Sequence, residues 1–243
     1  MNIIESIDIS SLVNKKFNSN TRVIFIRINP YPIDDTLKYI YNELFNKAWI
    51  NKYGKSLIRK SIEERCNKTI KKISEKLSLC QDDSVSSEAG EYIISILGKQ
   101  ALTENLNYIN IPLAELWKEK VLGNPGFDFH SESVENRIIF GEAKYVCGKN
   151  AYNNSLSQIN EFIELKKDLV EMADLDNLVS ELASSNFEDG KKGYAAAFSS
   201  TKIITSELIE HIFNNDLFKK LLIYDELLLV AVDINEWYFK TNN

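Results

Sequence analysis

The sequence predicts an α/β protein in which a mixed sheet is flanked by helices. Apolar segments of strand length recur at residues 137–146, 194–198 and 224–234, and segments with helical periodicity alternate with them. The 243 residues include only 4 prolines and 9 glycines, so long linkers are not expected. We therefore expect one core with a helical elaboration, the alternative being two small domains.

The N-terminal third predicts one strand and two helices. Residues 21–29 alternate apolar and polar side chains and end at Pro30, which is typical of a strand. Apolar residues then follow helical spacing over 37–49. A second helix is predicted over 58–77, where apolar residues recur at steps of four and three: Ile58, Ile62, Cys66, Ile70, Ile73 and Leu77.

The middle of the chain predicts a helix followed by a hairpin. After the polar break at 81–87 we expect a helix over 88–97, and then a short strand or loop and a helical turn within 107–121. Strands at 126–130 and 137–146 are joined by the loop 131–136 (SESVEN).

A long helix is expected over 151–173, with the apolar stripe Leu156, Ile159, Ile163, Val170 and Ala173, and a continuation over 175–182. A turn at 187–193 then leads to the last two strands, and a helix over 206–218 separates those strands.

Charge is concentrated in one segment. The net charge is −6, but residues 47–76 hold eight lysines and two arginines against three glutamates, a local charge of +7 that leaves −13 elsewhere. This asymmetry predicts a surface for phosphate groups of DNA or for an acidic partner, and the alternative is a solvated helix face.

Several classes of protein are disfavoured. The first residues lack the pattern of a signal peptide, and no apolar run has the length of a membrane span. Three widely spaced cysteines indicate the reducing cytoplasm rather than disulfides or a zinc site. Neither a glycine-rich nucleotide loop nor a GxSxG motif occurs.

The pattern Glu142-Ala-Lys144 is the strongest chemical signal. Two similar patterns, at 164–166 and 189–191, lie in a predicted helix and a glycine turn. Only Glu142 and Lys144 lie in an apolar strand, where side chains two residues apart share a face. Burying such charges is costly, which favours a functional reason for their presence.

Asp128 is expected to lie opposite Glu142. The loop 131–136 allows an antiparallel hairpin centred near residue 135, and residues 128 and 142 are equidistant from that centre. Facing carboxylates repel unless a cation such as Mg²⁺ joins them. Lys144 would then position the attacking water and offset developing negative charge. The alternative is a cross-strand ion pair at a sheet edge.

The run Gly126-Phe-Asp128-Phe-His130, a hairpin and Gly141-Glu142-Ala-Lys144 together resemble the core signature of the PD-(D/E)xK nuclease superfamily. The resemblance implies a restriction-endonuclease-like mixed sheet with a helical N-terminal elaboration, and a deoxyribonuclease that uses Mg²⁺ or Mn²⁺. It divides the chain into a basic N-terminal region, 1–84, packed on a nuclease core, 85–243. It also implies that Asp128 and Glu142 are metal ligands and that Lys144 is catalytic.

Two further residues follow from the same resemblance. Members carry a metal-binding glutamate on a helix before the hairpin, which here implies Glu91 as a catalytic metal ligand, with Glu88 as the reserve. The alternative for both is that acidic residues favour a helix N-terminus. Members also carry a glutamine after the lysine strand, which implies Gln158, although Phe162 replaces the tyrosine of the fuller motif.

More narrowly, the chain resembles the nuclease subunits of Hachiman-type antiphage systems (HamA), mainly over residues 85–165. This implies a role in bacterial defence beside an ATP-dependent helicase that controls the nuclease. Two alternatives stay open: a catalytically silent nuclease fold that binds DNA or assembles a complex, and an enzyme for small molecules or RNA in which Asp128 does not meet Glu142. We expect His130 to be a hydrogen-bonded structural residue, and Lys118 to be solvated.

Overall fold

The computed structural model describes residues 1–78, 80, 85–118, 126–201 and 204–234. Within them the strands form one mixed sheet in the order β1-β2-β7-β6-β5-β4-β3. Neighbouring strands from β2 to β5 are parallel, and the pairs at the two edges are antiparallel. The strands are β1 (Asn2–Asp8), β2 (Arg22–Asn29), β3 (Ile109–Asn110), β4 (Phe129–Glu132), β5 (Ile138–Lys144), β6 (Lys192–Ser200) and β7 (Glu226–Asp233).

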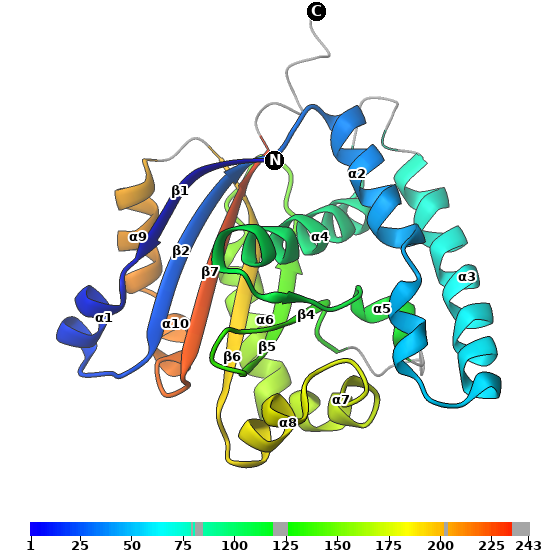
Figure 1. Cartoon of the computed structure of the whole chain (residues 1–243). Helices are drawn as coiled ribbons and strands as arrows, with labels where there is room; N and C mark the ends of the chain where they lie inside the picture. The colour runs from blue at the N-terminus through cyan, green and yellow to red at the C-terminus, as the bar shows by residue number, and fades with distance from the viewer. Residues whose placement is uncertain (79, 81–84, 119–125, 202–203, 235–243) are drawn as a thin grey trace, which may run out of the picture.

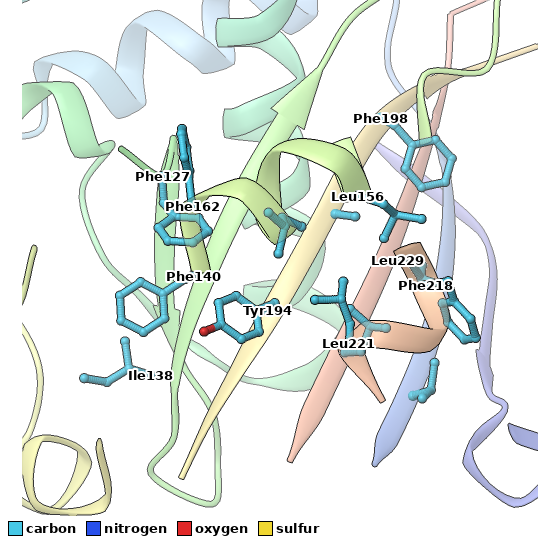
Figure 2. Close-up of a cluster of buried hydrophobic side chains, with 14 of the residues drawn as sticks. Phe127, Ile138, Phe140, Leu156, Phe162, Tyr194, Phe198, Phe218, Leu221 and Leu229 are labelled. Carbon is cyan, nitrogen blue, oxygen red and sulfur yellow. The ribbon is translucent and has the colours of Figure 1, made fainter. Parts of the chain in front are cut away.

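The central strands are buried on both faces, which explains their nearly continuous apolar sequences. Their side chains alternate between two hydrophobic clusters, one on each face of the sheet. Figure 2 shows one of them, in which Phe140 of β5 and Tyr194 of β6 pack beneath Phe162 and Leu156.

The first helical layer covers the face that carries Ile139 and Ala143 of β5. Its central helix is α4, which begins after Ser86, whose hydroxyl accepts a hydrogen bond from the amide of Ala89 and caps the helix. Figure 1 shows α4 crossing the sheet with α2 and α3 beyond it. The layer consists of α2 (Ile33–Phe45), α3 (Ser56–Ser78) and α4 (Ser87–Leu106), while η1 (Ala48–Lys52) and α5 (Ala114–Trp117) contribute side chains to both clusters.

The second layer covers the opposite face, and α6 packs directly on β5 and β6. It consists of α1 (Ser10–Phe17), α6 (Tyr152–Glu164), α7 (Lys167–Leu175), α8 (Glu181–Glu188), α9 (Thr205–Phe213) and α10 (Asp216–Leu221). The predicted α/β class, with helices flanking a mixed sheet, is therefore confirmed.

The predicted helix over 151–173 is wrong at its centre. It ends at Glu164, because Lys166 adopts the left-handed conformation with φ of 54° and α7 starts in a new orientation. Val170 is consequently 56% exposed, and Ala173 is exposed as well. Their places in the core are taken by Asp168 and Glu171.

Several other elements differ from the predictions. The helix expected over 37–49 is α2 and η1, the helix expected over 88–97 continues to Leu106, and the strand expected over 126–130 is β4 at Phe129–Glu132. The continuation over 175–182 is wrong because α8 begins at Glu181, and the turn expected over 187–193 is shared between the end of α8 and the start of β6. The helix expected over 206–218 is two helices, α9 and α10. The first strand and helix of the chain, β1 and α1, were not predicted.

The N-terminal strands belong to the same sheet as the rest of the chain. β1 and β2 precede the boundary expected at residue 84, yet β2 pairs along its length with β7. Among the described residues, none of the helices combines the length and the hydrophobicity needed to cross a bilayer.

Candidate active site

Asp128 and Glu142 face each other across the β4–β5 hairpin, as predicted. Phe129 pairs with Gly141, which places the preceding residue, Asp128, opposite Glu142. The amide of Asp128 donates to the carbonyl of Gly141 at 2.9 Å, and Oδ2 of Asp128 accepts from the amide of Ala143 at 2.8 Å. The backbone of β5 therefore holds both carboxyl groups in place.

Glu142 is a fully buried carboxyl group with few partners. The Nζ of Lys144 lies 2.9 Å from its Oε1, an ion pair without hydrogen-bond geometry. Within the described part of the chain, neither oxygen of Glu142 accepts a hydrogen bond. The strand is fixed at this point from α6, because the hydroxyl of Ser155 donates to the carbonyl of Glu142 at 2.9 Å.

The pKa values of the two carboxyls are raised by their surroundings. Burial raises the pKa of Asp128 to about 6, although the charge of Lys144 opposes the change. Burial, and then the charge of Asp128, raise the pKa of Glu142 well above its ordinary value. Burial disfavours the charge of Lys144, but the carboxylates of Glu142 and Asp128 outweigh it and raise the pKa of the amine. The site thus stabilises a cation.

Glu91 reaches the site from α4 through Lys144. Its Oε1 lies 3.4 Å from the Nζ of Lys144. The close approach of α4 depends on Gly90, because a Cβ there would lie 2.2 Å from the ring of Tyr145, the residue after β5. Glu88, the reserve candidate, instead forms an ion pair with Lys76 of α3.

The donor set fits a hard divalent cation in part. Two facing carboxyl groups, one of them without a hydrogen-bond donor, match the oxygen ligands that Mg²⁺ prefers. Across the described residues, no group of three or more His, Cys, Asp or Glu side chains is arranged to hold a metal ion. The role of Glu91 in metal binding stays a prediction.

Gln158 lies on α6 and is half-buried. Nothing among the described contacts links its amide to Asp128, Glu142 or Lys144 by a hydrogen bond, so its inclusion in the site also stays a prediction.

Sequence reasoning missed a second buried ionic cluster beside the hairpin. Glu171 of α7 accepts hydrogen bonds from Lys118 at 2.6 Å and from the amide of Phe127 at 2.8 Å, and it lies 2.7 Å from Nε2 of His130. The structural role expected for His130 is confirmed. The expectation of a solvated Lys118 is wrong, because its amine is buried against Glu171.

Lys118 of this cluster also interacts with the carboxylate pair. Burial lowers the pKa of Lys118, while Glu171, and then Asp128 and Glu142, act in the opposite direction through their charges. Lys118 is therefore close enough to both carboxylates to affect them. It joins Lys144 in offsetting their repulsion.

Comparison with family models, curated proteins and solved structures found no match to this chain. The residues and geometry of the site are therefore the basis on which its function can be inferred.

Proposed function

We propose that this protein is a metal-dependent DNA endonuclease of the PD-(D/E)xK type, with a restriction-endonuclease-like core. The observation that carries the proposal is the buried carboxylate pair, Asp128 and Glu142, with Lys144 held 2.9 Å from Glu142. Two carboxylates and an amine are rarely kept together in an ordinary protein core, because burying each ion costs on the order of several kcal/mol. The alternative of an enzyme for small molecules or RNA assumed that Asp128 and Glu142 lie apart, and the pairing of the hairpin strands contradicts that assumption.

Asp128 and Glu142 would hold Mg²⁺ or Mn²⁺, with Glu91 as a further ligand. The bound cation would supply Lewis acidity and lower the pKa of a water molecule. Because their pKa values are raised, the two carboxyls retain protons to a higher pH than ordinary carboxyl groups do when no cation is present. Cation binding is therefore expected to release protons and to weaken as the pH falls.

Lys144 would act on the substrate rather than on the cation. Its amine lies between two carboxyl groups, Glu142 at 2.9 Å and Glu91 at 3.4 Å, and its raised pKa keeps it in the charged form. A fixed ammonium group positions the attacking water and offsets the negative charge that develops on the phosphate. Gln158, one turn beyond Ser155 on α6, is the candidate for a further polar contact to water or phosphate.

The direct test is cleavage of plasmid DNA by the whole protein with Mg²⁺, with Mn²⁺ and with EDTA. We expect Glu142→Gln and Lys144→Met each to lower the rate by a factor of about 100 to 1000, the usual cost of losing one such group. The matched controls are Asp189→Asn and Lys191→Met, since that exposed acid–lysine pair has the same spacing and a 3.1 Å contact. Controls should keep full activity.

Retention of full cleavage by Lys144→Met would refute this mechanism. A wild-type protein that binds Mg²⁺ and DNA without cleaving would instead support the alternative of a catalytically silent nuclease fold. Calorimetric titration of Mg²⁺ separates these outcomes, because it measures the cation site without requiring turnover.

We further propose that the protein is the nuclease subunit of a bacterial antiphage complex controlled by a helicase. Support comes from the Hachiman-like motif set, from a sequence without a nucleotide-binding loop, and from a charge of −13 outside residues 47–76, which weakens unaided attraction to DNA. Co-expression with neighbouring gene products, followed by size-exclusion chromatography, tests this. Elution alone, with free DNA cleavage at physiological salt, would contradict it.

A further inference from the structure

The solvent side of α3 carries a regular row of positive charge. Its members are Arg65, Lys68, Lys72 and Lys76, which we call the α3 row. With 3.6 residues per turn, the steps of three, four and four place them on one flank of the helix, over a length of about 16 Å. The first three are exposed and Lys76 is half-buried.

The row lies apart from the core side of the helix, and two acidic residues border it. The buried side of α3 is formed by Cys66, Ile70, Ile73 and Leu77. Glu64 and Glu75 project from the neighbouring strip of the exposed face, where they lie 3.4 Å from Lys68 and 4.0 Å from Lys71. Exposed pairs of this kind are weak and are easily exchanged for other anions.

The row ends beside the candidate active site. Lys76 forms an ion pair with Glu88 in the first turn of α4, and its amine lies 5.7 Å from the ring centre of Tyr92. Glu91 follows Glu88 by one helical turn and contacts Lys144. In Figure 1 the end of α3 and the start of α4 lie on the same side of the molecule, and α4 also packs on β5 and its neighbouring strands.

We propose that the α3 row binds the phosphate backbone of duplex DNA and leads it to the carboxylate–lysine site. Phosphates follow each other every 3.4 Å or so along one strand of a duplex, so the row covers the rise of about five of them. This proposal deepens the proposed function and rests on it, because DNA would be led toward the carboxylate–lysine site only if that site acts on DNA.

The composition of this flank favours DNA over an acidic protein. Protein interfaces are depleted in lysine and centred on apolar or aromatic side chains. Three of the four charges in the row are lysines, Ser61 and Thr69 lie along the same flank, and Glu64 and Glu75 border it. Such a surface attracts a polyanion without reading its sequence.

The experiment compares two double variants of the full chain in EDTA, which prevents cleavage. The row variant is Lys68→Gln with Lys72→Gln. The control is Lys60→Gln with Lys71→Gln, which removes equal charge from the same exposed face about a quarter-turn away. Each variant removes one lysine of an exposed ion pair, Lys68 with Glu64 or Lys71 with Glu75. Binding to a fluorescent duplex is followed by anisotropy across a salt series.

We expect the row variant to reduce the slope of log K against log salt by about 2, since each lost phosphate contact removes about 0.9. Its affinity in 0.1 M salt should fall by a factor of 10 or more, while the control keeps the wild-type slope. Circular dichroism should show unchanged thermal unfolding in both.

Equal losses in both variants, or an unchanged slope in the row variant, would overturn the proposal, as would wild-type protein that does not bind the duplex. Failure of the nuclease mechanism gives a different result, namely row-dependent binding without cleavage when Mg²⁺ is added. If the row variant binds and cleaves DNA as the wild type does, the proposed role of the α3 row is wrong while the nuclease proposal stands.

Discussion

Replacing Asp128 by Asn should stabilise the metal-free protein at neutral pH. The carboxyl has its pKa raised from 3.8 to about 6 on folding, mainly by burial. At about 1.4 kcal/mol per unit, the ionised form costs about 3 kcal/mol. Because the folded state binds the proton more tightly, this cost is absent below about pH 4 and grows as the pH rises through 6. Asparagine keeps an oxygen for the amide of Ala143 and carries no charge.

The assay is urea unfolding of wild-type protein and Asp128→Asn in EDTA, at pH 4.5 and pH 8. Titrating groups remote from the site cancel in the difference between the two proteins, which should grow by about 2 kcal/mol in favour of the variant between these two pH values. Adding Mg²⁺ at pH 8 should stabilise the wild type, by about 2.7 kcal/mol at 100 times its Kd, and the variant less. A difference that does not change with pH, or a variant less stable than wild type at pH 8 in EDTA, would refute the reasoning.

Two other changes test the packing around the site by chemical unfolding. Gly90→Ala should destabilise by about 1–3 kcal/mol through overpacking on Tyr145, whereas Gly54→Ala, with no atom within 4 Å of the new Cβ, should change stability by less than about 0.5 kcal/mol. Glu171→Gln should cost about 3–5 kcal/mol at pH 7 because it leaves the buried amine of Lys118 without its anion. An effect of Glu171→Gln below about 1 kcal/mol would mean that water solvates the amine of Lys118 in the variant, and would contradict this prediction.

The hairpin and the long basic helix could be predicted because their signals are local. The loop 131–136 fixes the centre of the hairpin, and strand periodicity then pairs residue 128 with residue 142. The spacing of apolar residues over 58–77 likewise predicted α3 to within two residues at either end. Neither inference required knowledge of what the element packs against.

The orientation of α7 could not be predicted from its composition. Leu169 and Val170 are exposed there, while Asp168 and Glu171 are buried. The reversal is possible because the ammonium group of Lys118 offsets the charge of Glu171 and the His130 ring contacts its other oxygen, and these partners lie 53 and 41 residues away. A polarity pattern cannot reveal partners at such a separation, so it predicts that Asp168 and Glu171 lie on the surface.

The first strand, β1, could not be predicted for a different reason. β1 lies at an edge of the sheet, and most of its side chains are exposed or half-buried, so its sequence lacks the contrast of a buried strand. For the site itself, the sequence motif could suggest Glu91 as a candidate but could not give its position. That position depends on how closely α4 approaches β5 at Gly90, which packs against Tyr145.

The pairing of β2 with β7 has a consequence for the synthesis of the protein. Arg22 bonds to Glu226 across a separation of 204 residues. The hydrophobic strand VIFIRI therefore leaves the ribosome long before its neighbour exists. During that interval β1 can shield only one edge of it, and an unpaired β-prone segment is a nucleus for aggregation. Nascent chains are expected to need a chaperone at this strand, and ribosome profiling of chaperone-bound chains would reveal it.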